Sequence, residues 1–135
     1  PAYKEGDTLI FRGESSRKCW LYVFNVSIEG IFTLLLPNEF EKELFLLANS
    51  ALQLPVKSNR YAFIAEISNS GNIPVSSKKP QTEIIYALFY KGSEPLFTYS
   101  DRIKTEWSFV EFNKLLLQIP KNMRDSKFIS YTVHP

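Results

Sequence analysis

The chain has 135 residues, of which 44% are apolar and 22% are charged, as is typical of a folded globular domain. Its formal net charge is only +2, and basic and acidic residues are interleaved, which argues against nucleic-acid binding because phosphate recognition needs concentrated positive charge. A single cysteine excludes an intrachain disulfide. The aromatic share of 15% favours β-sheet, whose half-buried surfaces suit aromatic side chains.

Two strands are predicted at the start of the chain. Residues 6–15 begin with a Gly-Asp turn signal and continue as a partly exposed strand, in which Leu9 and Phe11 share one face. Residues 19–26 read CWLYVFNV and carry apolar side chains on both faces. A strand covered on both sides has this pattern, so we expect residues 19–26 to lie inside a layered core.

A β-hairpin follows. Gly30 ends a short connection at a position that needs a positive φ, and residues 31–36 form the returning strand. Pro37 cannot donate to a strand ladder and Asn38 favours turns, so the two residues end this strand. No catalytic loop is needed to explain the stop.

The next segment, residues 39–56, mixes helical and strand patterns. We predict an irregular connection with a short strand near 44–47 and a second strand at 51–55. Three glutamates begin the segment and alternate with Phe40 and Lys42, so we expect them to be solvated rather than paired for acid–base chemistry. They are Glu39, Glu41 and Glu43.

The second half of the chain predicts three more strands and one long loop. Residues 60–68 and 82–90 are strong strand patterns, and the second is apolar on both faces. Between them, residues 69–81 are rich in Gly, Pro and Ser, and loops of this length often carry function. A weaker pattern at 96–99 indicates a short strand, and residues 127–133 alternate as a final strand.

One helix is predicted, over residues 108–120. Ser108 and Glu111 have the spacing of a capping box, and Trp107 and Phe112 that of a hydrophobic staple. Pro120 ends the helix. The expected apolar face consists of Phe109, Phe112, Leu116 and Ile119.

These elements predict a mainly β protein: an antiparallel β-sandwich, immunoglobulin-like in general architecture, with one α-helix near the C-terminus. No inner linker or repeat divides the chain, so residues 1–135 are interpreted as a single domain. The sequence begins PAYKEGD without an initiating Met, and we expect the domain to be excised from a longer protein. No segment reaches the ~18 apolar residues of a membrane span.

Four separated pieces of the sequence resemble a known family. They are GDTLIF, WLYVFNVSIEGIFTLLLPNEF, the strand ending at Leu54-Pro55, and QTEIIYALF after the long loop. Together they resemble the bacterial β-sandwich family known as domain of unknown function 4384. The hairpin followed by Leu35-Leu36-Pro37-Asn38 is its most specific part, whereas Gln81 replaces the Gly that the family has before Thr82-Glu83.

The resemblance implies a non-catalytic accessory module in a larger bacterial protein of the envelope, secretion or signalling machinery. It carries no established catalytic residue. It also implies a periplasmic or cell-envelope location. The implied partners are another protein or other domains of the same chain, with polysaccharide as an alternative.

The sequence contains few residues suited to catalysis or metal binding. Cys19 and His134 are the only residues of their kinds, which is too few for a zinc site, and His134 lies at the far end without a Gly-x-Ser-x-Gly nucleophile motif. The glycines are scattered singly, so no phosphate-binding loop is present. We therefore expect no enzyme activity, no cofactor and no metal.

Two binding modes remain open. A protein partner could add a strand along an exposed sheet edge, where backbone groups lack partners. Alternatively, a carbohydrate could stack on exposed aromatic side chains, with Trp20 or Trp107 adding to the tyrosines. The discriminating feature is whether three or more aromatic rings lie coplanar and exposed on one sheet face. The candidate tyrosines are Tyr61, Tyr86, Tyr90, Tyr99 and Tyr131.

Overall fold

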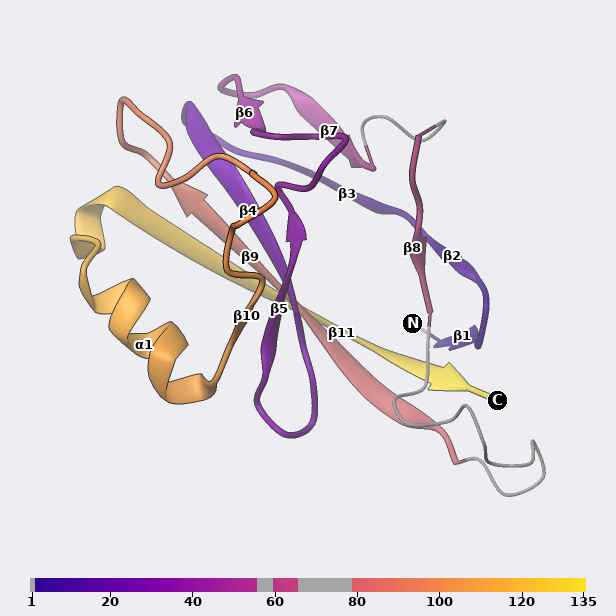
Figure 1. Ribbon diagram of the computed structural model, residues 1–135. Helices are drawn as coiled ribbons and strands as arrows, with labels where there is room; N and C mark the ends of the chain where they lie inside the picture. The colour runs from indigo at the N-terminus through magenta and orange to yellow at the C-terminus, as the bar shows by residue number, and fades with distance from the viewer. Residues whose placement is uncertain (1, 56–59, 66–78) are drawn as a thin grey trace.

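The computed structural model describes residues 2–55, 60–65 and 79–135 (Figure 1). These residues form mainly strands, with one α-helix near the C-terminus, as predicted. The strands are β1 (Ala2–Lys4), β2 (Thr8–Leu9), β3 (Phe11–Glu14), β4 (Cys19–Val26), β5 (Phe32–Leu36), β6 (Phe45–Leu46), β7 (Ala51–Leu54), β8 (Phe63–Ile64), β9 (Gln81–Tyr90), β10 (Glu106–Trp107) and β11 (Arg124–His134). The helix α1 (Phe109–Leu117) is followed by the 3-10 turn η2 (Lys121–Met123).

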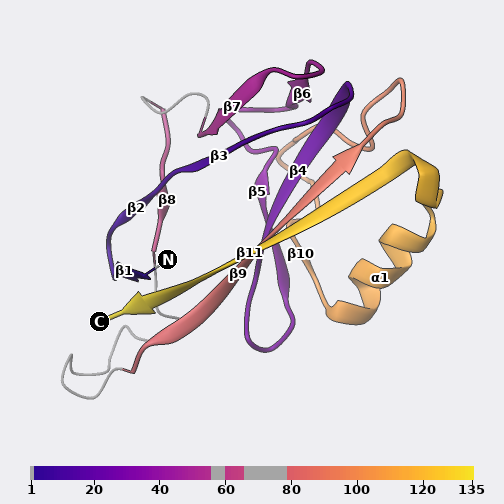
Figure 2. The same cartoon turned by 180° about the vertical axis from the view of Figure 1, so that it is seen from behind.

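The strands of the described residues form one large sheet and two small ones. The main sheet has the order β1-β11-β9-β4-β5-β10, and β6 also pairs with β4. The small sheets, β2-β8 and β3-β7, lie on one side of it, and α1 lies on the other (Figures 1 and 2). The pairs are antiparallel except β1–β11, which is parallel. The result is a sandwich of sheets with a helix on the outer face of the main sheet.

Each face of the main sheet has its own apolar core, as the pattern of residues 19–26 predicted. Leu21 and Val23 of β4 pack toward the small sheets, whereas Tyr22 and Phe24 pack toward α1. In β9, Ile85 belongs to the first core and Tyr86 to the second. The central strands are therefore covered on both sides, which fixes them in the middle of the molecule.

The β4–β5 hairpin has the turn that was predicted. Gly30 has a φ of +81°, a conformation that favours glycine. Within the hairpin Val23 pairs with Leu36 and Phe24 pairs with Leu34, so Leu35 is an extra residue. This bulge places Leu34 and Leu36 in different cores.

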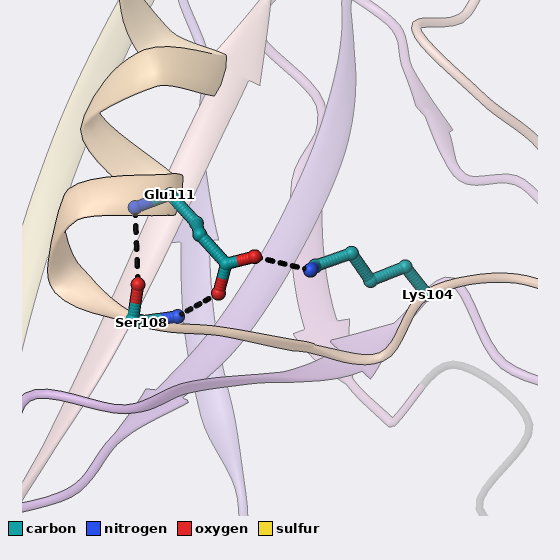
Figure 3. Close-up of polar contacts among 3 residues, drawn as sticks. All are labelled: Lys104, Ser108 and Glu111. Carbon is teal, nitrogen blue, oxygen red and sulfur yellow. Dashed lines mark hydrogen bonds and ion pairs between the residues drawn. The ribbon is translucent and has the colours of Figure 1, made fainter.

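The helix begins as its sequence predicted. The Ser108 hydroxyl accepts from the Glu111 N–H at 3.1 Å, and the Glu111 carboxylate accepts from the Ser108 N–H at 2.9 Å (Figure 3). Lys104 adds an ion pair to the same carboxylate at 2.7 Å. The rings of Trp107 and Phe112 meet at 6.4 Å, as expected for a hydrophobic staple.

Several sequence expectations differ from the structure. Residues 96–99 form no strand, because Leu96 is held by the Tyr22 hydroxyl, which accepts its N–H at 2.7 Å. Phe109 does not belong to the buried helix face: its side chain is 61% exposed. The predicted strand 60–68 is described at residues 60–65, of which Phe63–Ile64 form a strand, and residues 66–68 lie outside the described residues. Of the predicted loop 69–81, residues 69–78 also lie outside them.

Candidate partner-binding edge

The longest strand, β11, borders the main sheet along most of its length. On its inner side it pairs with β9 continuously from Arg124 to Val133. On its outer side it pairs with β1 only at Thr132, Val133 and His134. Within the described residues, no strand pairs with the outer side of residues 124–130. We refer to residues 124–130 as the β11 edge.

Two backbone hydrogen bonds show which groups of β11 point outward. The Lys91 N–H donates to the Met123 carbonyl at 2.8 Å, so the backbone groups of Met123, the odd-numbered residue just before β11, point toward β9. At the other end, the Glu5 N–H donates to the His134 carbonyl at 2.7 Å, so the backbone carbonyl of an even-numbered residue points toward the outer side, where β1 lies. Because backbone groups alternate sides along a regular strand, the even-numbered residues of the edge direct their N–H and C=O groups outward. These are Arg124, Ser126, Phe128 and Ser130.

The exposure of the side chains shows that the β11 edge is open to solvent. Ser126, Lys127 and Ser130 are exposed, and Phe128 is 62% exposed, although these side chains alternate between the two faces of the sheet. In the neighbouring strand β9, Tyr86 is 3% exposed. The layers that bury β9 on both sides therefore leave most of the edge exposed, although Ile129 is partly buried against the first core.

The side chains of the edge are fixed by their neighbours. Arg124 donates through Nε to the Ile119 carbonyl at 3.1 Å, and Asp125 forms a 2.7 Å ion pair with Lys91. Phe128 lies edge-to-face against Tyr86 at 4.8 Å, and the Tyr86 and Ser126 hydroxyls share a hydrogen bond. Ordered side chains lose less conformational entropy when a partner binds.

The opposite edge of the main sheet, beyond β4 and β5, is covered. There β10 pairs with β5 through Glu106 and Trp107, and the Leu34 N–H donates to the Thr105 carbonyl at 2.8 Å. Along β4, the first residues pair with β6, and the Leu21 N–H donates to the Leu44 carbonyl at 2.9 Å. Among the described strands of this sheet, β11 therefore has a long stretch, residues 124–130, whose outer backbone groups pair with no other strand.

The predicted tyrosines do not gather into one surface. Tyr86 and Tyr131 are 3% and 5% exposed and lie in the two cores, so neither offers a face to a ligand. Tyr90 is half-buried against Gly92. Tyr61 and Tyr99 are half-buried and line a shared groove of about 330 Å³.

The tryptophans proposed as platforms are also covered. Trp107 is 8% exposed within the core beneath α1. Trp20 is half-buried and donates through Nε1 to the Gly92 carbonyl at 3.2 Å. Among the described residues, the aromatic side chains classed as exposed lie on three different elements and form no common platform. They are Phe45, Phe109 and Phe128.

The groove of Tyr61 lies beside the corner that ends β5. The ring of Tyr61 stacks on Phe40 with an interplanar angle of 9° and a centroid distance of 5.8 Å, and Arg60 lies over the Phe40 ring at 6.0 Å. Burial, together with the nearby Glu41 carboxylate, raises the pKa of Tyr61 to about 12. The hydroxyl is therefore a neutral group throughout the physiological range.

The expectation that Glu39, Glu41 and Glu43 are all solvated is wrong for Glu41, which is 5% exposed. The cause is a tight turn at Asn38. The Asn38 side-chain oxygen accepts from the N–H groups of Phe40 and Glu41, both at 2.9 Å, and the Asn38 N–H donates to the Glu41 carbonyl at 2.9 Å. This turn directs Glu41 back toward the protein interior.

A second carboxylate missed by the sequence patterns is Glu83, which is 4% exposed. It lines a cavity of about 350 Å³ between the main sheet and the β2-β8 sheet, with Asn25, Thr33 and Tyr131 among the other lining residues. The strand pattern of residues 82–90 gave no signal for it, because the acidic residue follows a polar loop and precedes the apolar run. A buried polar position inside a strand depends on tertiary packing.

The residues considered for catalysis lie apart. Cys19 is buried, and burial raises the pKa of its thiol, so the thiolate nucleophile is disfavoured. His134 is exposed near the end of β11. In residues 2–55, 60–65 and 79–135, no three His, Cys, Asp or Glu side chains are grouped as metal ligands would be. The helices in these ranges are too short or too polar to span a bilayer.

Comparison with known proteins identifies one family. Neither the curated proteins nor the solved structures contain a match to this chain. A family model described as domain of unknown function (DUF4384) matches residues 2–72, which include the β4–β5 hairpin, its Pro37-Asn38 corner and Leu54-Pro55. The similar segment at residues 81–89 lies outside the matched range. Because the match covers more than half of the sequence, this chain belongs to the DUF4384 family.

Proposed function

We propose that this domain is a non-catalytic interaction module that binds a protein partner by strand addition along the β11 edge. The setting that the family resemblance implies is a larger bacterial protein of the envelope, secretion or signalling machinery. The observation that carries the proposal is the seven-residue edge, residues 124–130, with outward backbone groups and exposed side chains on both faces. Strand addition uses main-chain hydrogen bonds for affinity and alternate side chains for specificity.

The charges on the edge fit selective rather than indiscriminate pairing. Charged residues, and lysine above all, protect exposed edges from aggregation because an unmatched strand leaves them without a partner. The β11 edge carries Arg124, Asp125 and Lys127 around the apolar Phe128. A suitable partner strand therefore presents complementary charges beside an apolar residue.

A site-specific photo-crosslinker tests the proposal. A benzoylphenylalanine at Phe128 is expected to form a covalent adduct with a protein in bacterial cells, whereas the same group at the exposed Phe45 of β6 is not. Ser126→Pro removes an outward N–H without removing a donor to β9, so it should abolish the adduct, while Ser126→Ala, which keeps the N–H, should retain it. Circular dichroism checks that both variants fold.

The alternative function is carbohydrate binding, and one observation favours it: Tyr61 and Tyr99 share the groove beside Pro37-Asn38. Titration calorimetry with bacterial polysaccharides compares the two functions. Polysaccharide binding that Tyr61→Ala removes, combined with no protein adduct at Phe128, would overturn the interaction proposal in favour of the carbohydrate alternative.

A further inference from the structure

We propose that the partner of the β11 edge is a second copy of this chain, paired antiparallel with its two-fold axis at Ser126. This inference rests on the proposed strand-addition function. It follows from the direction of the backbone groups, the order of the charges along the edge and the position of β1.

The backbone restricts how two copies can pair. The even-numbered residues direct N–H and C=O groups outward, so an antiparallel pair must match even-numbered residues of one copy with even-numbered residues of the other. Three two-fold registers satisfy this condition and also pair at least five residues within the edge. Their axes lie at Ser126, Lys127 and Phe128.

Two of these registers are disfavoured. With the axis at Lys127, this lysine lies directly opposite its own copy, and like charges in that position are destabilising. With the axis at Phe128, Arg124 of one copy lies opposite Thr132 of the other. The outer side of Thr132 is already occupied by Ala2 of β1, so the two strands collide there.

The register centred on Ser126 resolves both problems. Arg124 lies opposite Phe128 of the second copy, so the paired stretch ends before it reaches β1. Asp125 lies opposite Lys127 of the second copy, in a non-hydrogen-bonded pair whose side chains are the closer ones in an antiparallel ladder. Because the dimer is symmetric, this ion pair forms twice. Both side chains are accessible, since Asp125 is 67% exposed and Lys127 is also exposed.

The other face of the edge is also compatible. Ser126 places its small side chain at the axis. The guanidinium of Arg124, anchored at Ile119, comes beside the exposed ring of Phe128 from the second copy, a combination suited to a cation–π contact. The edge is therefore self-complementary in charge and hydrogen bonding in this register.

Sedimentation velocity over a range of concentrations tests the dimer. Lys127→Glu places a glutamate opposite Asp125, and Asp125→Lys places a lysine opposite Lys127, so each single variant should weaken dimerisation about tenfold or more. The double variant Asp125→Lys/Lys127→Glu restores opposite charges and should recover the dimer. Lys121→Glu in η2 makes the same change of net charge as Lys127→Glu outside the paired stretch and should leave dimerisation unchanged.

Two proline variants test the register. Ser126→Pro removes the N–H at the two-fold axis and should abolish the dimer, whereas Ser130→Pro lies beyond the paired residues 124–128 and should leave it intact. A dimer that Ser130→Pro also abolishes, or single charge variants without rescue by the double variant, would overturn the proposed register.

The same data separate this inference from the proposed function. A chain that stays monomeric up to the highest concentration, yet forms an adduct from Phe128 to a different protein, overturns the dimer and supports strand addition. A monomeric chain that forms no adduct overturns both. A dimer that follows the charge pattern supports both.

Discussion

The rings of Phe24 and Phe112 lie 4.8 Å apart, centroid to centroid, in an edge-to-face arrangement that joins the middle of the main sheet to the helix. Both side chains are almost completely buried, at 0% and 1% exposed. Phe112 also contacts Phe32, Tyr86 and Trp107. Phe112 is therefore the buried residue by which α1 joins the core between the helix and the main sheet, with Leu115 and Leu116 packed beside it.

We expect Phe112→Ala to lower the free energy of unfolding by about 3–5 kcal/mol, because it removes a buried ring and leaves a cavity that the sheet cannot fill. Phe109→Ala is the matched control on the same helix and should change stability by less than about 0.5 kcal/mol, since Phe109 is 61% exposed. Urea denaturation measures both. Equal losses from the two variants would contradict the assignment of the buried helix face.

The capping box predicts an acid-dependent contribution to stability. Hydrogen bonds from Lys104 and Ser108 lower the pKa of Glu111 to about 2 from 4.5 (Figure 3). Because the pKa is lower in the folded state, the contribution of Glu111 is present above about pH 4.5 and is lost as the pH falls toward about 2. Urea denaturation of the wild type and Glu111→Gln should show a stability difference that shrinks over this range. Glu94→Gln controls for the loss of one negative charge.

Two glycines should respond differently to alanine. At Gly30 the φ of +81° is strained for any other residue, so Gly30→Ala should cost about 1 kcal/mol even though the new methyl group has room. Gly13 in β3 has neither a positive φ nor a close neighbour, so Gly13→Ala should be neutral or slightly stabilising. Thermal denaturation distinguishes them, and a costly Gly13→Ala would show that the β3 region is packed differently.

The raised pKa of Tyr61 predicts a loss of stability at alkaline pH. Its pKa is about 12 in the folded protein and 10 for an ordinary tyrosine, so its contribution is present below about pH 10 and is lost as the pH rises toward about 12. Tyr61→Phe keeps the ring contacts with Phe40 and Phe63 and should reduce this alkaline loss. Denaturation curves at pH 8 to 12 measure it. Identical alkaline profiles would mean that Tyr61 is not buried in this way.

Elements set by local chemistry could be predicted from the sequence. The helix start followed from Ser108 and Glu111, and the doubly covered strands followed from the unbroken apolar runs around Phe24 and Tyr86. The strands Phe45–Leu46 and Ala51–Leu54 also lie within the ranges predicted for them, near 44–47 and at 51–55.

Features set by distant neighbours could not be predicted. Residues 96–99 are apolar enough for a strand, but the Leu96 N–H is bound by the Tyr22 hydroxyl and the Tyr99 N–H by the Lys42 carbonyl. The sequence pattern predicted a solvated Glu41, but the turn at Asn38 directs its side chain inward. The candidate site depended on register: only the parallel pairing of Ala2 with Thr132, at the far end of β11, leaves residues 124–130 open.

Hydrogen exchange of individual β11 amides, followed by NMR, tests the open edge most directly. In dilute protein we expect the amides of Ser126, Phe128 and Ser130 to exchange quickly while those of Lys127 and Ile129 are protected by β9. At concentrations where two copies pair, Ser126 and Phe128 should become protected and Ser130 should not. Equal protection of odd- and even-numbered amides in dilute protein would contradict the open edge and the functions proposed for it.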